Sequence, residues 1–283
     1  MMKKIQICIL KILKFKMLLL KRLHHYSFFC RIFLFTCVFF CYFPMVQAQT
    51  ADSTIKKSST FSGSVGVSSN GFSIVPTFSL NSPASMTLLS WRKNKFSFDP
   101  DIRLTPNAKK GSMIFWLRYH AISTPKYRLR LGAHPAMNFQ QRDITVNGST
   151  ATISQMRRFL AWEVANDYKI NKYLSAGIYY LQGNGLQKDG ARTTHFVALN
   201  TSIGSIKLIK NVSLAINPSI YYLYLDGKEG RYVSGAIVLS HTKLPFTLQH
   251  AFNKTLSSNI PGNKDYMWNL SAHYLFKRTY RRV

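Results

Sequence analysis

Apolar and polar side chains alternate along one segment after another from residue 61 onward. In FSFDPDIRL, residues 96–104, Phe96, Phe98 and Ile102 are apolar, and their neighbours are polar or charged. The cleanest alternating face runs from Val212 to Tyr224. A period of two places the apolar residues on one face of a β-strand. Runs this long exceed the usual soluble strand of about 5–6 residues and match the roughly 9–11 residues of a membrane-crossing strand.

Counting back from the C-terminus, the alternation predicts twelve strands that begin near Gly71, with fourteen as the alternative. The expected strand segments are 71–80, 96–104, 113–119, 127–137, 157–167, 174–182, 194–204, 212–224, 232–241, 246–252 and 266–276. The alternation is weaker in 174–182 and mixed in 232–241. The segment 61–69 also has strand character, and Asn70-Gly71 suits a hairpin turn. Either 61–80 is one long bulged strand, or a further weak strand exists.

Connections between the expected strands alternate in length. Short ones at 92–94, 124–126, 170–173, 209–211 and 242–244 alternate with longer ones at 105–110, 142–155, 183–192, 226–230 and 258–264. Short turns on one side and long loops on the other are typical of bacterial outer-membrane barrels. The pattern therefore predicts an all-β, antiparallel up-and-down transmembrane β-barrel. A soluble β-sandwich is the alternative, but the strand lengths and the aromatic residues at strand ends favour the membrane.

The N-terminal segment has the features of an export signal. Eight Lys and Arg residues precede the apolar run Ile32–Phe43, and small or modest residues lead to Ala48. Twelve apolar residues are fewer than the roughly 20 that a transmembrane helix needs, so cleavage after Ala48 is favoured over a membrane anchor. Met17 is an alternative start. We expect a signal peptide over 1–48, a periplasmic leader over 49–60 and a barrel over 61–283 in a Gram-negative outer membrane.

Cysteine content and charge exclude several classes of function. All four cysteines lie in 1–48, so the remaining chain has no disulfide, cysteine-ligated metal or thiol nucleophile. Eight of the 38 basic residues and none of the ten acids lie there, which leaves a formal charge of +20 on residues 49–283. Export argues against nucleic acid as the partner of this charge. Lipid and lipopolysaccharide phosphates and the barrel-assembly machinery are expected partners, and no cofactor is expected.

The polar face of the expected strands carries a charged wall. Its members are Asp99, Asp101, Arg103, Arg118, His120, Arg128, Arg130, His134, Arg157, Glu163 and Asp167. Facing lipid would cost about 2–4 kcal/mol for each Arg at the midplane, so these side chains should face the lumen. They would then form either an arginine-bearing constriction for small polar or anionic solutes or a salt-bridged plug, because twelve strands leave limited room.

Two other functions compete with such a channel. An outer-membrane lipid hydrolase needs a serine and a histidine in catalytic order, and no His–Ser spacing in the chain matches one. A closed barrel with a structural or surface-binding role would act through the longest expected loop, Arg142–Gln155. The sequence therefore favours a passive porin-like channel without catalysis.

Several sequence segments of the chain resemble those of known barrel proteins. Ala48 followed by Gln49 and the closing segment DYMWNLSAHYLF resemble exported outer-membrane barrels of Bacteroidota-type bacteria. GFSIVPTFSL, FSFDPDIRL, RLGAHPAMNF and NIPGNKDYMWNLS resemble an uncharacterised porin-like family of these barrels. The resemblance covers nearly all of the chain after residue 48 and implies a barrel, but no assigned activity. Such barrels commonly end on an aromatic residue, whereas KRTYRRV follows Phe276 here, so either an internal assembly signal is used or Tyr280 extends the last strand.

Overall fold

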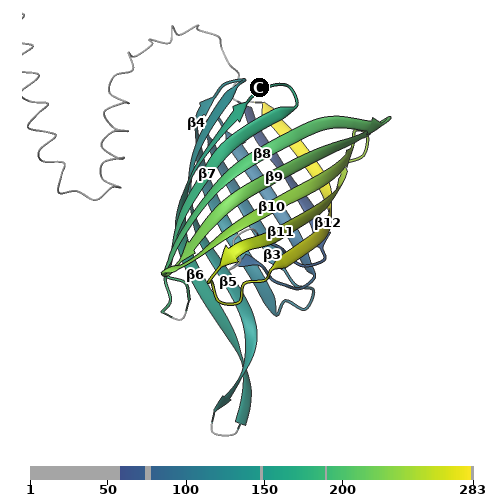
Figure 1. Cartoon of the computed structure of the whole chain (residues 1–283). Coiled ribbons are helices and arrows are strands. Elements are labelled where there is room, and N and C mark those ends of the chain that lie inside the picture. Colours follow the sequence, from purple (N-terminus) through teal and green to yellow (C-terminus); the bar gives the residue numbers. More distant parts are fainter. Residues whose placement is uncertain (1–57, 74–77, 147–148, 189, 282–283) are drawn as a thin grey trace, which may run out of the picture. The chain divides into compact units, whose positions relative to one another are not determined.

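The computed structural model describes residues 58–73, 78–146, 149–188 and 190–281, which form a closed antiparallel β-barrel (Figure 1). Its strands are β1 (Ser58–Ser68), β2 (Ala84–Lys93), β3 (Phe96–Leu104), β4 (Lys110–Ser123), β5 (Tyr127–Val146), β6 (Ser149–Lys169), β7 (Leu174–Gly185), β8 (Thr193–Ile209), β9 (Val212–Leu225), β10 (Lys228–His241), β11 (Phe246–Ser258) and β12 (Tyr266–Arg281). The predicted fold class and the count of twelve strands are confirmed. The expected signal peptide lies outside the described residues, and so does the expected leader up to residue 57.

Pairing between β1 and β12 closes the barrel. The register runs from Ser58 opposite Arg281 to Ser68 opposite Ser271 without interruption. Tyr280 is opposite Ser59. Residues 277–281 therefore belong to the last strand, as the alternative with Tyr280 in that strand predicted.

The identity of the first strand was predicted wrongly. The structure places 61–68 within β1, whereas the described residues of 71–80 form a loop. Gly71 and Asn81 have φ angles of 51° and 49°, and these left-handed conformations turn the chain at both ends of the loop. Leu80 N donates to Gly71 O, and Ser79 Oγ bonds both the N and the O of Ser73. Within the described residues, these hydrogen bonds join the two ends of the loop to each other.

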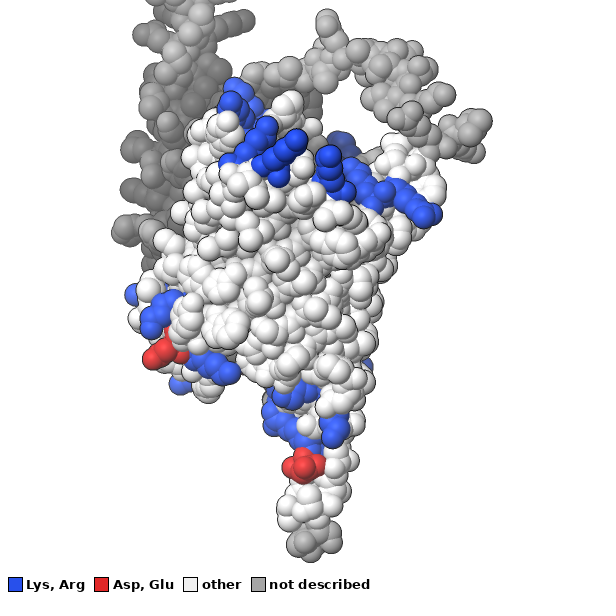
Figure 2. All heavy atoms as spheres, turned by 90° about the vertical axis from the view of Figure 1, so that its right-hand side faces the viewer, with Lys and Arg blue, Asp and Glu red and all other residues white. Residues whose placement is uncertain are grey.

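Large apolar side chains cover the outside of the barrel. Leu117, Leu199 and Ile220 are all more than half exposed, at 59%, 52% and 58%. Figure 2 shows a wide belt without charged residues between an upper band of Lys and Arg and a lower band of Lys and Arg with a few acidic residues. Such a belt suits the hydrocarbon region of a bilayer. The alternation along each strand therefore divides the side chains into a lipid-facing set and a lumen-facing set. No helix in the described part of the chain is long and apolar enough to cross a membrane.

The two ends of the barrel differ in their connections. The end that holds the C-terminus has short turns and is called the turn end; the opposite end, called the loop end, carries the loop after β1 and the long β5–β6 hairpin (Figure 1). Two loops expected there are shorter than predicted. Asp226 and Gly227, with φ of 48° and 82°, make a two-residue turn that suits an Asp-Gly pair. The pairing of β5 with β6 continues through Arg142 to Val146, so 142–155 is mostly a strand hairpin.

Candidate functional site in the barrel lumen

The fully buried carboxylate of Glu163 on β6 is the centre of a charged cluster in the lumen. Its Oε1 accepts hydrogen bonds from Arg118 Nε at 2.8 Å and Arg130 Nε at 3.0 Å. Its Oε2 accepts the hydroxyl proton of Tyr179 at 2.8 Å. The carboxylate therefore accepts hydrogen bonds from three strands, β4, β5 and β7. A buried charge is tolerated when it is paired and hydrogen-bonded in this way.

A glycine makes the contact between β4 and β6 possible. Gly132 on β5 lies between Arg118 and Glu163 in the same row of the sheet. A Cβ atom at Gly132 would lie only 2.8 Å from the Glu163 side chain. Because the glycine leaves this space empty, Arg118 can reach past one strand to the carboxylate.

Arg118 joins Glu163 to a second acid, Asp99 on β3. Arg118 Nη1 lies 3.0 Å from Asp99 Oδ2, and the guanidinium stands 4.3 Å from the centre of the Trp116 ring. Ser90 and Ser97 also donate to Asp99, at 2.6 Å and 2.9 Å. The cluster thus spans β2 to β7, and its arginine charges are balanced within the lumen.

A separate ion pair holds the loop after β1. Arg103 forms a bidentate contact with Asp101, with Nε and Nη2 at 2.9 Å and 2.7 Å from its two oxygens. Arg103 Nη1 also donates to the backbone oxygen of Phe72 at 2.6 Å. This arginine therefore fixes the inserted loop against the barrel wall.

The remaining predicted lumen residues are distributed along the barrel. His120 Nε2 lies 3.2 Å from Ser97 Oγ, and His134 is buried with its ring centre 4.0 Å from that of Trp116. Arg128 and Asp167 form an exposed pair at 3.8 Å near the turn end. Arg157 lines a separate cavity of about 250 Å³ at the loop end. The eleven residues are therefore not one continuous site. The alternation places Trp116 on the same face as Arg118 but does not predict the contact between them, nor Tyr179 as a partner of Glu163.

Apolar and aromatic side chains fill the lumen near the loop end. Tyr232, Leu223, Tyr221 and Phe196 are at most 3% exposed. The rings of Tyr221 and Tyr232 stack with centres 4.7 Å apart. Phe78 from the inserted loop packs edge-on against Phe159 of β6 at 5.2 Å. The alternation predicted a polar inner face, whereas the described inward residues here are apolar and packed against one another.

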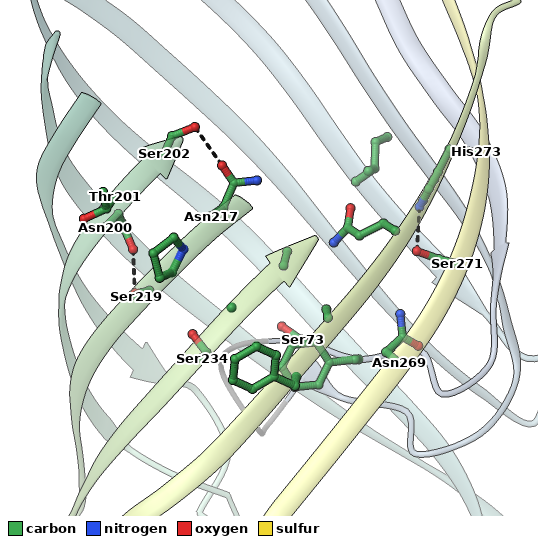
Figure 3. Close-up of a pocket in the computed structure, with 18 of the residues that line it drawn as sticks. Ser73, Asn200, Thr201, Ser202, Asn217, Ser219, Ser234, Asn269, Ser271 and His273 are labelled. Atoms are coloured by element: carbon green, nitrogen blue, oxygen red, sulfur yellow. Dashed lines mark hydrogen bonds between the residues drawn. The ribbon is translucent and has the colours of Figure 1, made fainter. Parts of the chain in front are cut away.

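A cavity of about 500 Å³, called the central cavity, lies along the wall of the barrel opposite the charged cluster (Figure 3). Its polar lining comes mainly from neutral side chains of β8 to β12. These include Asn200, Thr201, Ser202, Asn217, Ser219, Ser234, Asn269, Ser271 and His273. Several bond to one another across strands, as Ser202 does to Asn217 at 2.7 Å and Ser219 to Asn200 at 2.7 Å. Its size lies within the range of about 300–1,000 Å³ typical of small-molecule sites.

Serine and histidine side chains come close together in the lumen. Ser97 and His120 are neighbours, but Asp99 accepts the hydrogen bond of the serine and does not orient the histidine as a catalytic triad requires. Within the described residues, no group of three His, Cys, Asp or Glu could hold a metal ion.

Strand pairing, closure and the apolar exterior define the class: the chain has the fold of an outer-membrane β-barrel. No family model and no curated protein matches it. Solved structures of similar fold include OmpT of Vibrio cholerae, at 9% identity over 79% of this chain and 99% of that chain, with a TM-score of 0.40. Others are the KdgM porin (9%, 76% and 99%, TM-score 0.45) and LpxR from Salmonella typhimurium (10%, 76% and 99%, TM-score 0.45).

Proposed function

We propose that the protein is a narrow, passive outer-membrane channel that takes small polar solutes into its lumen. The central cavity carries this proposal, because it combines about 500 Å³ of space with a wall of hydroxyl and amide groups. Such groups can exchange hydrogen bonds with a hydrated solute without binding it tightly. Twelve strands lie between the roughly eight that side chains fill and the 16–18 that leave an open channel. A low conductance is the expected consequence.

The charged cluster has a structural role in this proposal. Arg118 and Arg130 share Glu163, and Arg118 also contacts Asp99. Paired guanidiniums offer little net field to a passing anion, so the cluster stabilises the wall between β2 and β7. Solutes pass along the neutral wall opposite, and the middle of the lumen selects weakly between ions.

Passage requires the packed side chains at the loop end to rearrange. Phe159 is the ring on β6 that meets Phe78, and its neighbour Leu160 is 50% exposed on the outer face. Phe159→Ala should therefore widen the loop end, whereas Leu160→Ala should change only the lipid-facing surface. The two variants form a matched pair, because they remove large apolar side chains from adjacent positions on opposite faces.

Planar-bilayer recordings of the refolded protein test the proposal. The parent protein should show discrete openings of low conductance, Phe159→Ala openings of higher conductance, and Leu160→Ala openings like those of the parent. The absence of openings in both the parent and Phe159→Ala would overturn the channel and leave a closed barrel with a structural or surface-binding role. Heat-modifiable gel migration of all three proteins checks that each barrel has formed.

The same proposal places the chain in the outer membrane of a Gram-negative bacterium, with the turn end toward the periplasm. Support comes from the apolar belt and from the short turns at the end that holds the C-terminus. The basic bands at either side of the belt in Figure 2 would then contact lipid and lipopolysaccharide phosphates. Assembly by the barrel-assembly machinery follows from the same location.

A further inference from the structure

A further cavity lies at the turn end, between the β4–β5 turn, the β6–β7 turn and β8. This turn-end cavity has a volume of about 380 Å³ and is lined by four cationic side chains: Lys126, Arg128, Lys169 and Lys172. All four residues are exposed. Backbone pairing fixes the turns that carry them, because Lys169 N donates to Lys126 O at 2.7 Å.

The cations of the turn-end cavity are not neutralised by acids in the way that those of the charged cluster are. Among the described residues, the carboxylate that pairs with the group is that of Asp167, which lies 3.8 Å from Arg128 with both side chains about half or more exposed. Lys172 Nζ instead stands 4.8 Å from the centre of the Tyr173 ring. Four cations and one acid leave a net positive charge at this position, and a mouth with one sign of charge concentrates counter-ions.

The turn-end cavity and the central cavity adjoin each other. Ser175 and Ser202 line both, and Asp167 and Arg128 join the two by their ion pair. A solute held among the lysines therefore borders directly on the wall of hydroxyl and amide groups. The loop end, in contrast, holds packed aromatic residues.

We propose that the two cavities form one two-part site for a small hydroxylated anion, a sugar acid or a sugar phosphate, which the solute reaches from the turn end. The cationic mouth holds the carboxylate or phosphate, and the Ser, Thr and Asn wall accepts and donates hydrogen bonds to the hydroxyl groups. Anion preference then resides in the mouth, to which Arg128 belongs, rather than in the paired Arg118 and Arg130 of the charged cluster. This inference rests on the proposed uptake of polar solutes and names their class.

Equilibrium binding to the refolded protein in detergent tests the site without any need for conductance. The probes are glucose 6-phosphate, gluconate, glucose and inorganic phosphate. Both hydroxylated anions should bind more tightly than glucose, which lacks the charge, and than inorganic phosphate, which lacks the hydroxylated body. Their affinity should fall as ionic strength rises, because the mouth is exposed to solvent.

Two pairs of substitutions locate the site. The double variant Lys126→Gln/Lys169→Gln should weaken binding of glucose 6-phosphate about fivefold or more, if each exposed contact contributes about 0.5 kcal/mol or more, and should leave glucose binding unchanged. Lys210→Gln/Lys243→Gln, at turns outside the cavity, should leave both unchanged. Asp167→Asn removes the acid at the mouth and should strengthen binding of the anion.

Equal affinity for glucose 6-phosphate in the two double variants would overturn the inference. So would equal affinity of the parent protein for inorganic phosphate and glucose 6-phosphate, because the central cavity would then contribute nothing. Either failure leaves the proposed channel intact as long as bilayer openings are seen. Loss of those openings with retained anion binding would instead reject the channel and keep the site.

Discussion

Neutralising Glu163 should destabilise the barrel, because this carboxylate is fully buried and accepts three hydrogen bonds. In Glu163→Gln, two guanidiniums lose their shared negative partner, and an amide nitrogen takes the place of one acceptor. Removing one partner of a buried ion pair typically costs about 3–5 kcal/mol. Arg118 keeps Asp99 at 3.0 Å, and Arg130 is one-third exposed. We therefore expect a cost near the low end, about 3 kcal/mol.

Urea unfolding of the refolded protein in lipid vesicles, followed by tryptophan fluorescence, measures this cost. Asp167→Asn is the matched control, because it also removes one lumen carboxylate from β6 that pairs with an arginine of β5. Its pair is 3.8 Å long with side chains 67% and 47% exposed, and such pairs contribute about 0–1 kcal/mol. If Glu163→Gln lowers the free energy of unfolding no more than Asp167→Asn does, the structural role assigned to the charged cluster is refuted.

Two further pairs of substitutions test which residues face lipid and whether Gly132 makes room for the contact between Arg118 and Glu163. Leu199→Arg places a charge on the lipid side and should lower the free energy of unfolding by about 2–4 kcal/mol. Asn200→Arg places the same charge in the central cavity and should reduce conductance with a smaller effect on the free energy of unfolding. A larger loss of stability in Asn200→Arg than in Leu199→Arg would contradict the assignment of faces. Gly132→Val should separate Arg118 from Glu163 and lower the free energy of unfolding by about 1–3 kcal/mol, as overpacking does. The control Gly204→Val places its side chain in open space and should leave the free energy of unfolding unchanged in the same urea titration.

The sequence predicted the barrel because lipid outside and a lumen inside impose one alternation on every strand. It could not identify the first strand, because a period of two looks the same in a strand and in a loop whose apolar residues fill the lumen. The segment after Gly71 is such a loop: Phe78 and Leu80 are buried inside the barrel. Only the pairing of β1 with β12 distinguishes the two cases, and pairing between distant segments leaves no local signal.

Charged lumen positions were recognisable from the alternation, but their partners were not. The contact from Arg118 to Glu163 depends on the register of three strands and on the missing side chain of Gly132. The apolar packing inside the loop end could not be predicted for another reason. Inward residues such as Leu181 and Leu223 are apolar like the lipid-facing ones, so composition alone cannot tell a packed lumen from an outer face.

Chemical modification of single cysteines during bilayer recording tests the central claim most directly, because the chain has no cysteine after residue 48. Asn217→Cys lines the central cavity, and Ile220→Cys is 58% exposed on the outer face as isoleucine. A bulky hydrophilic thiol reagent added from the turn end should reduce the conductance of Asn217→Cys and leave that of Ile220→Cys unchanged. Unchanged conductance in Asn217→Cys after confirmed modification would contradict a solute path through the central cavity.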